Sequence, residues 1–185
     1  MSRDILKMRA RKIGIDHLAS PEFLAINPNG KVPALVDGEV KLWESVAIMA
    51  YLSESAGADL WPKNTADQIE VLRWLMWDAT HFSRHAATLY VENFVRKAFN
   101  MGAPNPAAIE EASGFFKQFA AILDAHLAKR LFLVADRWSI ADFAVASFLP
   151  DAEKAGLPIA GFTHIGQWHA RLLELPAWRA PFPVP

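Results

Sequence analysis

A group of polar residues on either side of two short apolar segments could hold a small charged molecule. Lys31-Val32-Pro33 precedes these segments, and Glu44-Ser45 follows them directly. At the start of a helix, Ser45 would offer a hydroxyl group and free amides to a carboxylate, which the helix dipole favours. Glu44 suits an ammonium group, Lys31 suits a second carboxylate, and a cis Val32–Pro33 bond would turn the Val32 amide and carbonyl toward a ligand's own backbone. The implied ligand is a short peptide-like zwitterion with an acid at each end.

The elements that must position these groups are a hairpin and the helix after it. Residues 32–36 and 40–43 are short apolar runs, and Asp37-Gly38-Glu39 separates them. Because glycine accepts the positive φ of a tight turn, this pattern predicts two antiparallel strands. The apolar spacing after Ser45 predicts a helix that runs to about Ser55 and stops near Gly57.

Downstream of Pro62, almost everything has helical periodicity. Thr65 and Gln68 form a capping-box pattern in front of a long helix that should end before Gly102. The apolar stripe predicted for this helix consists of Ile69, Leu72, Met76, Ala79, Ala86, Tyr90 and Phe94.

Three further helices are expected in this part of the chain. One starts at Asn105 with Pro106 in its first turn, and its predicted stripe is Ile109, Ala112, Phe116, Phe119, Ile122 and Leu127. Another starts at Ser139, where Asp142 completes a capping box. The last covers residues 163–173. The fold class is therefore α+β, with an N-terminal domain over residues 1–62 and an all-helical C-terminal domain over residues 63–185.

Composition narrows the classes of function. The 185 residues carry a net charge of −1, and the one basic cluster, residues 7–12 (KMRARK), contains no aromatic residue, which disfavours nucleic-acid binding. No window reaches the roughly 18 apolar residues of a membrane span, and the N-terminus has no signal-peptide pattern, so a cytoplasmic protein is expected. Because the sequence has no cysteine, any thiol chemistry must use a thiol that arrives with the ligand.

Two separated motifs carry a resemblance to a known family. The first comprises Asn27-Pro28-Asn29-Gly30-Lys31-Val32-Pro33, the Asp-Gly turn, and Trp43-Glu44-Ser45 with Ala47-Ile48 and Tyr51-Leu52; the second is Ser139-Ile140-Ala141-Asp142-Phe143. From about Ser20 to the C-terminus, the chain resembles a bacterial glutathione transferase of the soluble superfamily.

The resemblance implies roles for several residues. The backbone of Val32, before the cis-proline Pro33, would pair with the cysteinyl part of glutathione. Glu44 and Ser45 would hold the γ-glutamyl end, and Lys31 would lie near the glycyl carboxylate. The resemblance also implies a thioredoxin-like first domain, a homodimer, a detoxifying conjugation of glutathione to small apolar electrophiles or a reduction of peroxides, and no metal.

The start of the chain departs from the family pattern. A βαβ unit needs about 30 residues, but only twenty precede Pro21, so the first strand and the loop after it are expected to be missing. Residues 5–12 could be the remnant of the first helix, or residues 12–16 could be the second strand. In relatives, that loop carries the thiol-activating residue; Ser2 is a weak substitute here. A shortened or mis-assigned start, a degenerate paralogue and a rebuilt site all remain open. A non-catalytic binding module of the same fold is the alternative function.

The remaining candidates have plainer explanations. Trp74, Trp77 and His81 lie on the helix that lines the acceptor pocket in relatives, although aromatic stripes more often form a core. His81 and His85 have a spacing that could bind a metal, but two ligands do not make a site. His17 lies near the place of a family histidine that contacts the glycyl carboxylate.

The motif formed by Ser139 and Asp142 is interpreted as structural, both here and in relatives. Its loss should reduce stability by about 1 kcal/mol or somewhat more, without a direct effect on chemistry.

Overall fold

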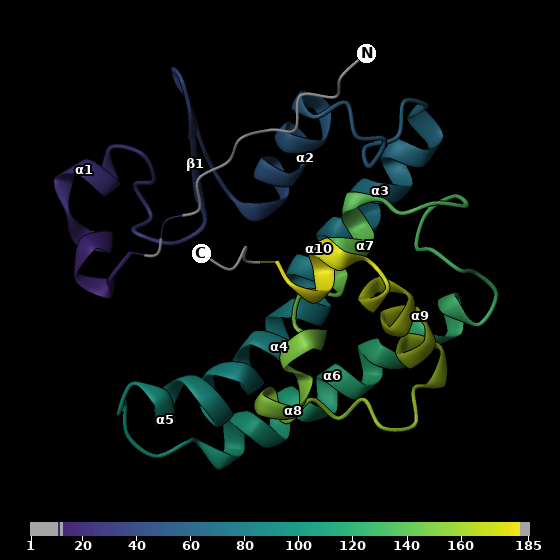
Figure 1. Cartoon of the computed structure of the whole chain (residues 1–185). Helices are drawn as coiled ribbons and strands as arrows, with labels where there is room; N and C mark the ends of the chain where they lie inside the picture. The colour runs from purple at the N-terminus through teal and green to yellow at the C-terminus, as the bar shows by residue number, and fades with distance from the viewer. Residues whose placement is uncertain (1–10, 12, 182–185) are drawn as a thin grey trace. The chain divides into compact units, whose positions relative to one another are not determined.

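The computed structural model describes residue 11 and residues 13–181. The chain forms two compact units, one within Met1–Trp61 and one within Pro62–Pro185 (Figure 1). The first contains a two-stranded antiparallel sheet and the second is helical, which confirms the predicted α+β class. Within the described residues, no helix is both long enough and apolar enough to cross a membrane.

The N-terminal unit is built around the predicted hairpin. Its described elements are η1 (Ile15–Ala19), α1 (Pro21–Leu24), β1 (Ala34–Asp37), β2 (Val40–Trp43) and α2 (Ser45–Ser55). Ala34 pairs with Trp43 and Asp37 pairs with Val40. Gly38 has a φ of 57° in the turn, a conformation that glycine adopts without steric cost. The hairpin and the bounds of α2 therefore agree with the sequence prediction.

The second strand proposed for residues 12–16 is wrong for the part that the structure describes. Ile13 and Gly14 are irregular, and a 3₁₀ helix begins at Ile15. Its turn closes through a hydrogen bond from the His17 amide to the Gly14 carbonyl, 3.0 Å long. Local hydrogen bonding thus replaces the strand. The alternative, a helix over residues 5–12, lies outside the described residues except for Arg11.

The helical unit has α6 at its centre. Its described elements are α3 (Thr65–Trp77), η2 (Asp78–Phe82), α4 (Ser83–Tyr90), η3 (Val91–Val95), α5 (Arg96–Ala98), α6 (Pro106–Leu127), α7 (Ile140–Val145), η4 (Leu149–Asp151), α8 (Ala152–Ala155), α9 (Thr163–Leu173) and α10 (Pro176–Arg179). α6 packs against both α4 and α9 (Figure 1). The core between these helices includes Phe82, Phe116 and Trp168, all fully buried.

The predicted long helix forms, but two π-helical segments interrupt it. η2 and η3 are each five residues long and separate α3, α4 and α5. A π segment inserts an extra residue into the turn and so rotates the faces that follow it. A pattern of 3.6 residues per turn contains no signal for this change.

The face that α3 buries differs from the predicted stripe. Ile69, Leu72 and Met76 are 58%, 44% and 65% exposed, whereas Val71 and Trp74 are buried. Apolar side chains lie on more than one face of α3. The buried face is the one that carries the large indole ring of Trp74. On α6 the same error is smaller: Leu123 is buried in place of the neighbouring Ile122, while the predicted Ala112, Phe116 and Leu127 are buried.

The capping box predicted from Thr65 and Gln68 is wrong by one position. The side chain of Asn64 caps α3 by accepting a hydrogen bond from the Asp67 amide at 2.9 Å. Gln68 instead donates its side-chain amide to the carbonyl of Pro62, 2.9 Å away. Asparagine is as good an N-cap as serine or threonine, so Asn64 and Thr65 were both suitable from the sequence, and Asn64 is the one that caps α3.

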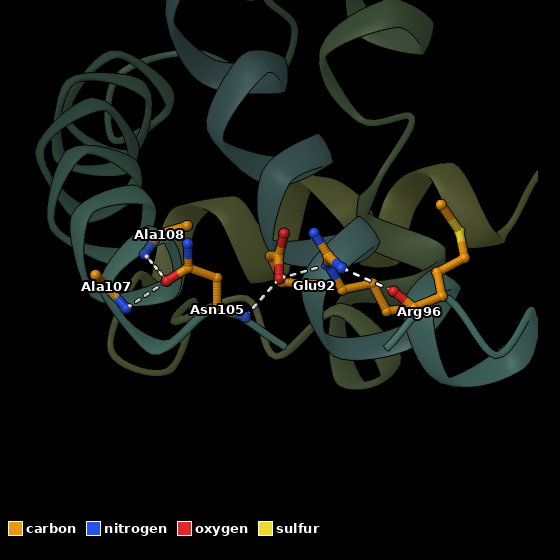
Figure 2. A network of polar contacts seen from close by, with 6 residues as sticks. Glu92, Arg96, Asn105, Ala107 and Ala108 are labelled. Carbon is orange, nitrogen blue, oxygen red and sulfur yellow. Dashed lines mark hydrogen bonds and ion pairs between the residues drawn. The ribbon is translucent and has the colours of Figure 1, made fainter. Parts of the chain in front are cut away.

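A polar network fixes the connection between η3 and α6 (Figure 2). Glu92, which is 8% exposed, accepts a hydrogen bond from the Asn105 amide at 2.7 Å and pairs with the Arg96 guanidinium at 2.8 Å. The Asn105 side chain caps α6 through the amides of Ala107 and Ala108, as its position predicts. These hydrogen bonds, led by that from the Asn105 amide, lower the pKa of Glu92.

The capping box of α7 is confirmed, and it extends further than the motif suggests. Asp142 is fully buried and accepts hydrogen bonds from the amide and hydroxyl of Ser139, both 2.9 Å long. Its other oxygen accepts from the Leu133 amide at 2.9 Å and from the Trp168 indole at 3.1 Å. One carboxylate therefore ties together α7, the loop before it and α9.

Candidate functional site

The loop that precedes β1 is shaped by a buried asparagine. Asn27 is 3% exposed; its side chain donates to the Lys31 carbonyl at 2.6 Å and accepts from the Asn29 amide at 3.0 Å. Gly30, between them, has a φ of 61°, and a Cβ there would lie 3.2 Å from the Leu18 carbonyl oxygen. Only glycine suits this position. The Val32–Pro33 peptide bond that follows is cis.

The hairpin brings this loop to the start of α2. Because Ala34 pairs with Trp43, Pro33 and Glu44 lie next to each other at the same end of the hairpin. Together the loop and the helix start enclose a pocket of about 300 Å³, lined by Asn27, Asn29, Lys31, Val32, Pro33, Glu44 and Ser45. Five of the six residues singled out for ligand binding thus meet in one place, within a single compact unit, and His17 is the exception.

The N-terminus of α2 lacks a side-chain cap. Glu44 occupies the N-cap position but makes no capping hydrogen bond with its side chain, and Ser45 is the first helical residue. By contrast, Ser20 caps α1 and Asn105 caps α6. The first amides of α2 are therefore left for a ligand, since a helix N-terminus requires acceptors. Capping of α2 by a side chain therefore does not explain why Glu44 and Ser45 occupy these positions.

Glu44 has an unusual backbone. Its φ of 70° and ψ of 117° lie outside the regions that residues with a side chain normally occupy. Such strain costs about 1–3 kcal/mol and concentrates at functional sites. Here it lets the chain pass from β2 directly into α2 while both Glu44 and Ser45 face the pocket.

These groups could recognise a zwitterion with two acids. The uncapped α2 terminus and the Ser45 hydroxyl suit a carboxylate, and the Glu44 carboxylate suits an ammonium group. The Lys31 ammonium group, at the other side of the cis-proline, suits a second carboxylate. Val32 is 61% exposed, and its backbone amide and carbonyl suit pairing with an extended peptide between these two ends.

Two liners of this pocket, Asn27 and Asn29, were not singled out from the sequence as ligand-site residues. The signal was present: an asparagine two residues before another turn-forming asparagine is typical of a side chain that bonds to its own backbone. Asn27 acts here as a positioning residue, because its hydrogen bonds hold the turn from which Lys31 extends.

Other candidates lie elsewhere. His17 is exposed on η1, with its ring 6.1 Å from that of Phe23, and it is not among the pocket liners. Ser2 lies outside the described residues. In the helical unit, Trp74 is buried and its ring lies 5.0 Å from that of Trp77, while His81 is exposed and stacks on Phe119.

His85 also stacks on aromatic rings, those of Phe115 and Phe119. Over the described part of the chain, no cluster of three metal-binding side chains occurs. The rings of His81, on η2, and His85, on α4, stack on phenylalanine rings of α6.

Comparisons with known proteins identify the family. The family model "Glutathione S-transferase, N-terminal domain" matches residues 12–54, and "Glutathione S-transferase, C-terminal domain" matches residues 106–183. The chain is 34% identical to glutathione S-transferase 3 of Zea mays, over 89% of this chain and 78% of that protein. It is 33% identical to GstB of Escherichia coli K12, over 96% of this chain and 85% of that protein.

Solved structures give the same result. A theta-class glutathione S-transferase from Xanthomonas axonopodis pv. citri, with glutathione bound, has a TM-score of 0.77 and 31% identity, covering 88% of this chain and 77% of that one. The structure of glutathione S-transferase III in its apo form has a TM-score of 0.79 and 32% identity, covering 94% and 85%. The chain belongs to the glutathione S-transferase family, whose thioredoxin-like and helical units its fold reproduces.

Proposed function

We propose that this chain binds glutathione in the pocket between the cis-proline loop and α2, and that it transfers the bound thiol to small apolar electrophiles or uses it to reduce peroxides. The observation that carries this proposal is the uncapped start of α2 beside Glu44, Ser45 and Lys31. In the assignment, Ser45 and the α2 amides hold the γ-glutamyl carboxylate, and Glu44 holds its ammonium group. Lys31 faces the glycyl carboxylate, and the Val32 backbone pairs with the cysteinyl residue.

The domain roles follow from this assignment. Residues 1–62 would form the thioredoxin-like glutathione-binding domain and residues 63–185 the helical domain that contributes the electrophile pocket. Trp74, Trp77 and His81 remain the candidates for that pocket, and His17 stays a predicted contact of the glycyl end. The reducing cytosol, where glutathione is abundant, is the compartment we propose. The bacterial affiliation stays a prediction from the sequence.

A homodimer is the proposed assembly. The exposed apolar side chains Ile69, Leu72 and Met76 recur along one face of α3, where water would otherwise contact them. Such a stripe is typical of a surface that a partner covers. Light scattering after gel filtration should give twice the mass of one chain, and Leu72→Glu should halve it. A wild-type chain that elutes as a monomer would remove the proposal.

The binding test uses the whole chain and paired variants. Ser45→Ala and Glu44→Gln should each weaken glutathione affinity by about tenfold or more in calorimetric titrations, since each loses a charge-assisted hydrogen bond. Ser55→Ala, at the opposite end of α2, and Glu39→Gln, in the hairpin turn, are matched controls that should bind normally. Normal binding by both pocket variants would refute the site.

A non-catalytic glutathione-binding module is the second candidate. One observation favours it: among the described residues that line the pocket, none is a tyrosine or a cysteine, and the hydroxyl of Ser45 is engaged by the ligand carboxylate in the assignment above. A free thiol has a pKa of about 8.5 and needs a donor that favours the thiolate near neutral pH. Conjugation of an aryl halide, measured beside the titration, separates the two functions. Turnover supports the transferase, whereas binding without turnover supports the module.

A further inference from the structure

A second pocket lies in the helical unit, where α6 ends and α9 begins. It has a volume of about 280 Å³, and its lining includes Lys129, Arg130, His164, Gln167 and Arg171. Three of these five residues are permanent cations. The loop after α6 provides Lys129 and Arg130, and the body of α9 provides Arg171.

Arg171 is held in place without losing its charge. Its guanidinium donates to the Leu131 carbonyl at 2.7 Å and to the Gln167 carbonyl at 3.3 Å. Carbonyl groups orient a guanidinium but leave it with a full positive charge. Within residues 13–181, no carboxylate forms an ion pair with Lys129, Arg130 or Arg171. The three cations therefore lack counterions of their own.

Two acidic groups that interact with residues of this pocket are already engaged. Asp124 accepts hydrogen bonds from the amides of His164 and Ile165, at 2.8 and 2.9 Å, and from the His164 ring at 2.9 Å. Glu70, which interacts electrostatically with Arg130, forms its ion pair with Arg73.

The chemistry of this pocket suits one class of ligand. Guanidinium groups form paired hydrogen bonds with phosphate oxygens, and a lysine ammonium group adds a point charge. Lys129 and Arg130 are exposed, so water and salt weaken the attraction between each of them and an anion. A ligand therefore needs more than one negative charge to bind here. We propose that this pocket is a second ligand site that binds a small phosphate-bearing anion, separately from the glutathione pocket in the other unit.

Titration calorimetry with inorganic pyrophosphate, at a fixed ionic strength of about 0.15 M, tests the proposal. The wild-type chain should bind pyrophosphate saturably, and the Lys129→Ala/Arg130→Ala double variant should lose about tenfold or more in affinity. The control double variant, Arg84→Ala/Lys117→Ala, removes the same charge from exposed positions on α4 and α6. It should bind pyrophosphate as the wild type does.

Three results would overturn the site: no saturable binding by the wild type, equal losses in the two double variants, or a loss in Lys31→Ala that places the anion in the glutathione pocket. The Lys129→Ala/Arg130→Ala variant should bind glutathione with the affinity of the wild type, which shows that this variant is folded. As an independent measurement, pyrophosphate should raise the Tm of the wild type above its value in sodium chloride of equal ionic strength. Vesicles that contain phosphatidic acid, used in place of pyrophosphate, distinguish a lipid phosphate from a free one.

Discussion

Replacing Asp142 by alanine tests how far one buried carboxylate organises the helical unit. The side chain accepts four hydrogen bonds, from the Leu133 amide, the Ser139 amide and hydroxyl, and the Trp168 indole. The variant leaves three of these donors buried without an acceptor, because only the hydroxyl can rotate to a new partner. The loop before α7, α7 itself and α9 would therefore each lose a hydrogen bond to the Asp142 carboxylate.

The structure sets the size of the effect. A buried donor without a partner costs about 1–3 kcal/mol, so three donors give roughly 3–9 kcal/mol before relaxation. Burial raises the pKa of Asp142 despite its hydrogen bonds, and the alanine variant is relieved of that unfavourable charge. We therefore expect a net loss of about 3–5 kcal/mol. This exceeds the value of about 1 kcal/mol for an N-cap alone, because a cap serves one helix and Asp142 serves three segments.

Urea unfolding, followed by far-ultraviolet circular dichroism, measures this loss directly. Ser139→Ala is the matched control: it removes the hydroxyl cap and keeps the carboxylate, so it should cost only about 1 kcal/mol. Asp142→Asn should fall between the two, since one oxygen still accepts while the new amide group faces another donor. If Asp142→Ala cost no more than Ser139→Ala, the hydrogen bonds to Leu133 and Trp168 would contribute nothing to stability, which would refute this role of Asp142.

Two further predictions concern pH. Burial raises the pKa of Asp78 from 3.8 to about 6, against hydrogen bonds from Ser83, so the folded chain loses stability as the pH rises between these values. Asp78→Asn should raise the free energy of unfolding at pH 7 by about 2–3 kcal/mol and flatten its pH dependence below about pH 6; a variant no more stable than the wild type at pH 7 would contradict this. Hydrogen bonds from Asn105 and Arg96 lower the pKa of Glu92, so its contribution is present near neutral pH and disappears as the pH falls through the folded pKa. Glu92→Gln should lower Tm at pH 7, and this effect should shrink as the pH falls below 4.5, the ordinary pKa of glutamate; an effect that does not change with pH would argue against the network in Figure 2.

Patterns that depend on neighbouring residues were readable from the sequence. The hairpin, α2, α6 and α9 follow from a turn glycine, an N-cap and apolar spacing, all of which act within a few residues. Ser139 and Asp142 belong to this group as well. The α7 capping box needs only a hydroxyl and a carboxylate three residues apart, and both bonds form as expected.

Features that depend on distant contacts were missed. The buried face of α3 is determined by what packs on Trp74, including the His126 ring 4.6 Å away on α6. The π segment η2 packs against α3, α4 and α6, and η3 packs against α8, so both segments depend on contacts that no local pattern predicts. Links from Asp142 to Leu133 and Trp168 span nine and 26 residues. Single-helix periodicity cannot contain such information.

The pocket proposed for glutathione depends on both local and distant contacts. Each of its residues is part of a local motif. The loop that ends at Pro33 and the start of α2 at Glu44, however, are brought together only by the register of the hairpin. Ala34 faces Trp43 because a two-residue turn follows Asp37, and this pairing sets Pro33 beside Glu44. A slip of one residue would send every side chain of one strand to the other face and move Glu44 away from the cis-proline. The Asp-Gly turn, which contacts no ligand in the proposed assignment, is therefore as necessary to binding as the charged groups, because it fixes the distance between the sites that hold the two ends of the peptide.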